Sequence, residues 1–76
     1  MPSRFAVMDF KDTVIVDEVD ANTVYVGKAK PGSATSDPVW AITQTLTAGD
    51  ITTTAFAGGT AEYDKIWDNR ASFTYT

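Results

Sequence analysis

Apolar and polar residues alternate most clearly over 39–47, which predicts a half-buried strand. Trp40, Ile42 and Leu46 share one face of this strand, interrupted by Gln44, and threonines occupy the other face. A compact turn at 48–50 leads into residues 51–57, which contain three consecutive threonines. The two segments predict an antiparallel hairpin whose exposed face is covered by threonines.

A second hairpin is predicted nearer the N-terminus. Residues 13–16 are threonine, valine and isoleucine, and the acidic segment 17–20 after them suggests a strand that runs into an acidic bend. The chain turns at 20–22 and returns over 23–27, with Val14 and Val16 on one face and Ile15 on the other. Residues 4–9 are short and apolar and predict a strand or an extended arm, followed by a turn at 10–12.

The remaining segments predict loops and a closing strand. Residues 28–38 contain no large apolar side chain, and Pro31-Gly32 and Asp37-Pro38 favour turns. Residues 60–67 fit either a short helix or an irregular turn, and 67–70 fit a structured turn. The alternation of Ala71, Phe73 and Tyr75 with polar residues predicts a final strand over 71–76. That strand must pair either with its own sheet or with a neighbour's.

Together these elements predict a single all-β domain over 1–76. The expected architecture is a small antiparallel sandwich or open barrel of five to six strands, with at most one short helical turn. Residues 1–10 are expected to form an extended arm or an edge strand.

Composition shows how so small a domain could be stabilised. The chain has 76 residues and no cysteine or histidine, so a disulfide is excluded and a zinc site is disfavoured. Domains of this size often need a metal, a disulfide or a partner. We therefore expect a homo-oligomer, with a trimer among the candidates, or docking on a larger assembly.

Charge and hydropathy disfavour two classes of partner. The net charge of −4 is divided equally, at −2 for residues 1–38 and −2 for residues 39–76, so no basic face is available for nucleic acid. The sequence contains no apolar run long enough for a membrane helix and no signal-peptide pattern, which favours synthesis in the cytoplasm.

The sequence offers little catalytic chemistry. Without histidine or cysteine it lacks the usual nucleophile and base pairs, so we expect no enzyme, no cofactor and no metal. The acidic segment 17–20 could contribute calcium ligands, but a solvated bend is the more economical interpretation. Asp64 and Asp68 could act as an acid and base pair, or could cap a turn and pair with Lys65 or Arg70.

The aromatic residues allow two interpretations. Trp40 and Trp67 are most simply core residues, but large rings are hard to cover in a small chain and are favoured anchors at interfaces. Arg70 either braces its own turn or reaches across an interface. The candidate interface residues are Phe5, Val7, Tyr25, Trp40, Trp67, Asp68, Asn69, Arg70, Phe73 and Tyr75.

Two segments of the chain form a recognisable pattern. The first runs from Tyr25-Val26-Gly27 through a Gly/Ser/Thr loop to Trp40-Ala41-Ile42. The second begins with a glycine-rich turn at Gly59 and closes on Trp67-Asp68-Asn69-Arg70-Ala71-Ser72 and Tyr75. They cover about two thirds of the chain, and the closing motif is the more specific. In this pattern the chain resembles small structural proteins of tailed-bacteriophage virions, which implies a virion component without catalytic activity.

The leading hypothesis is a capsid decoration (cement) protein that bridges major capsid subunits and is located in the virion. Alternatives are a structural protein of the neck, tail or head-fibre base, and a host-directed binding module outside the virion. The expected partners are the phage major capsid protein or other virion proteins. The sequence leaves the host, the copy number and the symmetry open.

Overall fold

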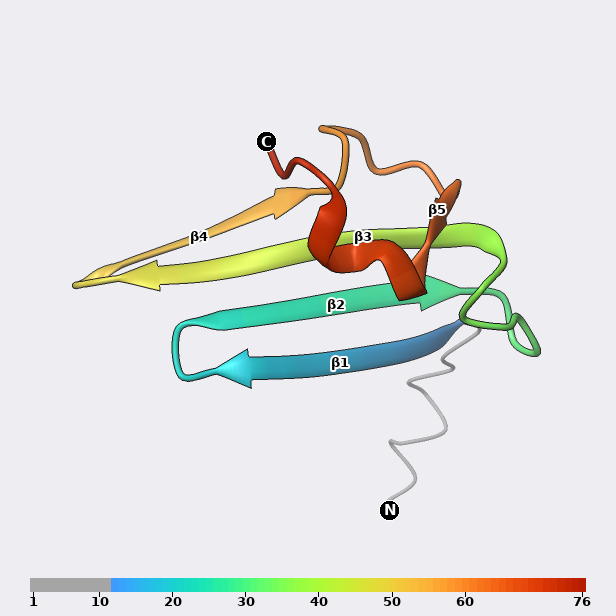
Figure 1. The fold of residues 1–76 in the computed structure, drawn as a ribbon, viewed down its shortest axis with the longest axis horizontal. Helices are drawn as coiled ribbons and strands as arrows, with labels where there is room; N and C mark the ends of the chain where they lie inside the picture. The colour runs from blue at the N-terminus through green and yellow to red at the C-terminus, as the bar shows by residue number, and fades with distance from the viewer. Residues whose placement is uncertain (1–11) are drawn as a thin grey trace, which may run out of the picture.

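The computed structural model describes residues 12–76. Its elements, in chain order, are β1 (Thr13–Asp20), β2 (Thr23–Ala29), β3 (Pro38–Ala48), β4 (Ile51–Phe56), β5 (Lys65–Ile66) and the 3₁₀ helix η1 (Trp67–Ser72). The antiparallel sheet has the order β1-β2-β3-β4, and β5 pairs with the start of β3 (Figure 1). The predicted all-β fold, with five to six strands and one short helical turn, is confirmed. The predictions for residues 1–10, including the arm and the strand at 4–9, lie outside the described residues.

The β1–β2 hairpin is longer than the sequence indicated. Val16 lies opposite Val26, and Asp17 and Glu18 lie opposite Tyr25 and Val24, so these two acids belong to the strand and not to a bend. Extended backbone places them on opposite faces of the sheet. The chain turns at residues 21–22, as predicted, where the Asn22 amide donates a hydrogen bond to the Asp20 carboxylate at 2.8 Å.

The β3–β4 hairpin confirms the predicted division of faces. Gly49 adopts a φ of 63° in the tight turn, a conformation that glycine reaches without a steric penalty. On the threonine face, the hydroxyls of Thr45 and Thr54 lie 2.9 Å apart, and those of Thr47 and Thr52 lie 3.1 Å apart. These cross-strand hydrogen bonds fix the register of the hairpin.

The C-terminal segment departs from the prediction. A strand over 71–76 was expected, but Ala71 and Ser72 belong to η1, and the pairing is reduced to one antiparallel bridge between Tyr75 and Ala57. The helix replaces the strand because Trp67 turns into the core and the following residues coil over the sheet. The bridge lies within the same chain, so this segment pairs with its own sheet and not with a neighbour's. Residues 60–64 are irregular, as one of the two alternatives for 60–67 predicted, but Lys65–Ile66 form the strand β5, which neither alternative included.

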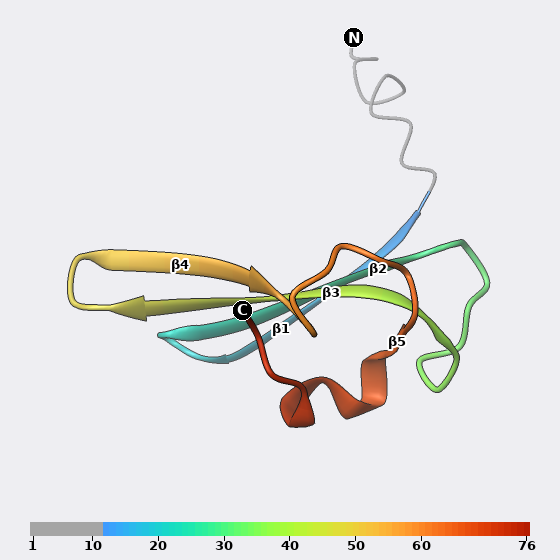
Figure 2. The ribbon, with the colours of Figure 1, turned by 90° about the horizontal axis from the view of Figure 1, so that it is seen from above.

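The core lies between the sheet and η1, which covers one side of the sheet (Figure 2). Alternation places Ile15, Tyr25, Gly27, Trp40 and Ile42 on this covered face. The most buried cluster consists of Tyr25, Ala29, Trp40, Ile42, Ala57 and Trp67. The opposite face carries valines on β1 and β2 and threonines on β3 and β4.

Candidate interface surfaces

Trp40 joins the sheet to the loop that precedes β3. Its ring is fully buried, and its indole Nε1 donates a hydrogen bond to the Ala34 carbonyl at 2.9 Å. The Asp37 carboxylate accepts a hydrogen bond from the Ala34 amide at 3.0 Å, which closes a turn just before Pro38. The polar loop therefore supplies the acceptor that a buried indole requires.

Trp67 covers Trp40 from the other side of the core. The two ring centroids lie 6.0 Å apart at an interplanar angle of 43°. Beneath them, Gly27 leaves the space for the rings, since a Cβ atom at this position would lie 2.5 Å from Trp67 Cε3. The Tyr-Val-Gly strand and the closing Trp motif therefore pack against each other, although they are far apart in the sequence.

Arg70 braces η1 against the sheet. Its guanidinium carbon lies 4.6 Å from the centroid of the Trp67 ring, and Nη1 donates to the Trp67 carbonyl at 3.2 Å. Its Nε also donates to the Asp17 carboxylate at 3.0 Å. These contacts agree with the interpretation that Arg70 stabilises its own turn, although the ionic partner is on β1. A half-buried cation over an indole contributes about 1 kcal/mol.

Tyr75 closes the other end of η1. Its hydroxyl donates to the Arg70 carbonyl at 2.6 Å, and its ring lies 5.7 Å from that of Tyr25. The Tyr25 hydroxyl in turn accepts a hydrogen bond from the Gln44 side chain at 3.3 Å. Burial, reinforced by the neighbouring Tyr25, raises the pKa of Tyr75 to about 12.

The predicted interface residues fall into three groups. Tyr25, Trp40 and Trp67 are buried and serve the core of the chain, as the simpler interpretation of the tryptophans held. Arg70, Phe73 and Tyr75 are half-buried around η1, while Asp68 and Asn69 are exposed on it. Phe5 and Val7 lie outside the described residues. A direct role at an interface stays a prediction for the side chains that keep exposed surface.

The structure has an exposed apolar surface that the sequence did not indicate. Leu46 and Ile51 are exposed apolar side chains on one face of the β3–β4 hairpin near its tip, and we call them the hairpin-end patch. Leu46 shares its face with Trp40 but is 45% exposed, and Ile51 is 68% exposed. The lengths of the two elements explain this exposure. The eleven residues of β3 span about 33 Å, whereas the six residues of η1 span about 12 Å and cannot cover the whole strand.

The side of the sheet away from η1 forms a further surface (Figure 2). Its centre consists of Val14, Val16, Val24 and Val26, and we call these four residues the valine face. Val14 and Val16 are 46% and 56% exposed. The register places Val14 and Val16 on β1 beside Lys28 and Val26 on β2.

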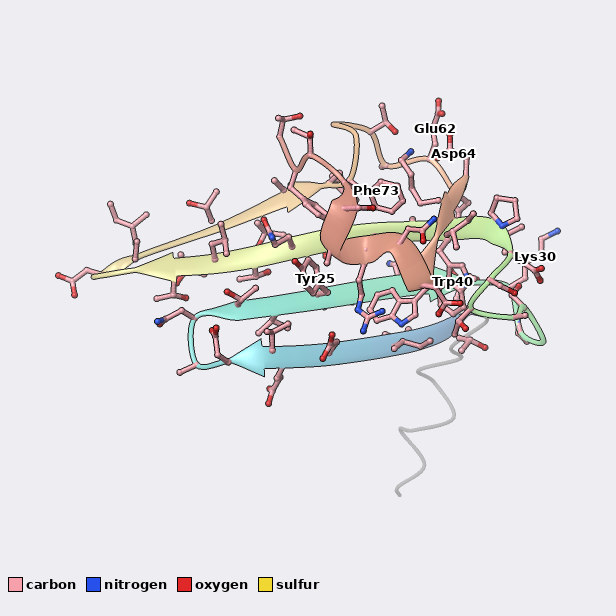
Figure 3. All side chains as sticks on the ribbon, viewed as in Figure 1. Tyr25, Lys30, Trp40, Glu62, Asp64 and Phe73 are labelled. Atoms are coloured by element: carbon pink, nitrogen blue, oxygen red, sulfur yellow. The ribbon has the colours of Figure 1, made fainter. Side chains whose placement is uncertain are left out.

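Two of the acidic candidates form ion pairs. Asp17 pairs with Arg70, and Asp64 pairs with Lys65. The Lys65 hydrogen bond holds the pKa of the Asp64 carboxyl below its usual value. Asp64 and Glu62 lie on the loop between β4 and β5, away from the aromatic residues Tyr25 and Trp40 (Figure 3). Within residues 12–76, no group of three acidic side chains is placed to hold a metal ion.

One pocket of about 430 Å³ lies at the end of the sheet where β1 begins, lined by Asp12, Lys30, Ser33, Val39 and Tyr63. The Tyr63 hydroxyl donates to the Asp12 carboxylate at 3.4 Å, and the Ser33 hydroxyl donates to the Lys30 carbonyl at 2.8 Å. Ser33 is therefore engaged by backbone and is not paired with a base.

No helix among the described residues is long and apolar enough to span a membrane. Comparison with models of protein families, with curated proteins and with solved structures finds no match to this chain.

Proposed function

We propose that this chain is a non-enzymatic structural protein of a tailed-phage virion, and that it acts as a decoration protein on the capsid. The observation that carries the proposal is the hairpin-end patch. Ile51 and Leu46 remain exposed although the β3–β4 pairing on which they lie is regular from end to end. Exposed aliphatic side chains grouped on a folded surface are typical of sites that bind another protein.

The surroundings of the patch suggest the chemistry of its partner. Asp20 ends β1 and Asp50 lies in the β3–β4 turn, so carboxylates border the aliphatic side chains. This arrangement fits an apolar partner surface with basic groups at its rim. A patch of so few residues binds weakly by itself, but repeated copies on a symmetric shell reinforce one another.

The closing motif supports the choice of class through its resemblance to phage structural proteins. Trp67 and Arg70 of this motif hold η1 on the sheet, while Asp68 and Asn69 face outward. The motif thus gives a rigid body that presents two polar side chains. Rigidity favours binding because little conformational entropy is lost on docking.

The copy number in purified particles tests the proposal. Quantitative mass spectrometry should find a stoichiometry close to that of the major capsid protein. A handful of copies that co-purify with tails would contradict the decoration role and favour the neck, tail or fibre base. Absence from particles, together with capture of a host protein, would favour a host-directed module instead.

A matched pair of variants tests the patch itself. Ile51→Asp should lower occupancy on particles at least about tenfold, because a carboxylate would be buried against an apolar partner. Thr60→Asp, at an exposed position in the loop after β4, should leave occupancy unchanged. Equal occupancy for the two variants would show that another surface binds the particle.

A further inference from the structure

The valine face poses a physical problem that the described residues do not solve. A sheet with an apolar face needs a second layer to cover it. On the side away from η1, Val14 and Val16 are about half exposed, and Phe56 at the other edge of the sheet is 38% exposed. At one end Tyr63 approaches this side through Asp12, but residues 12–76 leave Val14 and Val16 at its centre exposed.

Two charged side chains lie on the same side of β1 and β2 as the valine face. Glu18 lies opposite Val24 at one end of the face, and Lys28 lies opposite Val14 at the other end. Four residues along β2 separate the two ends, a distance of about 13 Å. The pair Val16 and Val26 lies midway between them.

We propose that the valine face is a self-association surface, and that its occupant is a second copy of this chain. The two sheets would stack face to face, related by a twofold axis that crosses the strands at the Val16–Val26 pair. This rotation exchanges the two ends of the face. Glu18 of each copy then lies beside Lys28 of its partner, and the valines fill the centre between the charges.

Charge complementarity selects this occupant and this orientation. A face with opposite charges at its two ends is complementary to a copy of itself turned end to end, which is the requirement for an isologous contact. A twofold axis parallel to the strands would instead place Glu18 near valines and leave Lys28 without its counterpart. The contact is therefore specified by charge as well as by burial.

The neighbouring threonines permit close approach of a second layer. The hydroxyls of Thr45 and Thr54 bond to each other, as do those of Thr47 and Thr52. Each of these four hydroxyls already takes part in one hydrogen bond, so covering them costs less than covering unpaired hydroxyls. Their methyl groups extend the apolar area from the valines toward β4.

The area is sufficient for a modest dimer. Four strands about 4.8 Å apart, each contributing about seven residues, give a flat footprint of about 440 Å² on each copy. Protruding side chains enlarge the accessible area beyond this footprint, which brings the sum of both copies near the lower limit of specific interfaces, about 1,200 Å². Association should therefore depend visibly on protein concentration.

Sedimentation velocity of the full chain, over about a hundredfold range of concentration, tests the proposal. The wild-type protein should shift from monomer to dimer as its concentration rises. Val16→Lys should weaken association at least about tenfold, because it buries two uncompensated charges at the twofold axis. The matched control is Thr53→Lys, at an exposed position on the opposite side of the sheet, which should associate like the wild type. A wild-type monomer at every concentration would overturn the proposal.

Charge reversal at two exposed side chains tests the orientation. Glu18→Lys and Lys28→Glu should each weaken dimerisation about threefold to tenfold, and the double reversal should restore it. Dimerisation that is indifferent to the single reversals would overturn the arrangement. Because these measurements use the isolated chain, their result is independent of the copy number in particles.

Discussion

One face of one sheet contains both the best-covered and the least-covered apolar side chains of the described chain. At the end near η1, Trp40 and Ile42 are 0% and 1% exposed. At the hairpin end, Leu46 and Ile51 are 45% and 68% exposed, although alternation assigns Leu46 to the same face as Trp40. The difference does not come from the strand pattern. It arises because a six-residue helix cannot cover an eleven-residue strand.

This comparison separates two uses of apolar residues in one element. Near η1 they fill a core in which Trp67, Gly27 and Trp40 fit together. At the hairpin end the same kind of residue remains available to another molecule. The buried core thus lies at one end of this face, and the hairpin-end patch lies at the other.

The largest expected effect on the free energy of unfolding comes from removing the Trp67 ring, which covers the core. Trp67→Ala should lower the free energy of unfolding by about 3–5 kcal/mol, since it empties the space above Gly27 and Trp40. Ile51→Ala, at the hairpin end, should change it by less than about 1 kcal/mol. Urea denaturation followed by circular dichroism measures both variants. Equal losses would show that the two ends do not differ in the isolated protein.

A smaller effect should follow from adding a single carbon to the core. In Gly27→Ala the new Cβ would lie 2.5 Å from Trp67 Cε3 and 3.2 Å from Trp40 Cε3, so the rings must move. We expect a loss of about 1–3 kcal/mol, measured by thermal unfolding. Ala48→Val adds carbon at the exposed tip of the same face and should be nearly neutral. A neutral Gly27→Ala variant would show that the packing near η1 is loose.

The smallest effect concerns pH. The phenol of an unfolded tyrosine ionises near its ordinary pKa of 10.0, whereas the folded pKa of Tyr75 is about 12. Between these values the unfolded chain releases this proton and the folded chain keeps it, so the free energy of unfolding falls as pH rises from 10 to 12.

After allowance for solvent screening, this contribution should be about 1 kcal/mol. Urea denaturation across this pH range measures it, with Tyr75→Phe as the control. The Phe variant should lose less stability over the same interval. Equal alkaline losses in the two proteins would show that Tyr75 ionises as easily folded as unfolded.

The sequence by itself determined the strands and their faces. Alternation over 39–47 separated Trp40 and Ile42 from the threonines, and the turn at Gly49 fixed the hairpin, because side-chain direction in a strand follows directly from position along the chain. The all-β class followed from the same local rules, as did the two opposite valine and isoleucine faces of β1.

Only the tertiary structure decided how much of the sheet η1 covers and which residues the closing motif contacts. Alternation over 71–76 predicted a strand, but the insertion of Trp67 beside Gly27 draws this segment into a 3₁₀ helix over the sheet. Likewise, Arg70 meets Asp17, which is fifty-three positions away, and not the nearer Asp68. Such contacts depend on how segments that are distant in the sequence pack together, and local side-chain periodicity carries no information about that packing. For the same reason, the sequence could not predict that Leu46 and Ile51 are exposed, because their exposure depends on the length of η1.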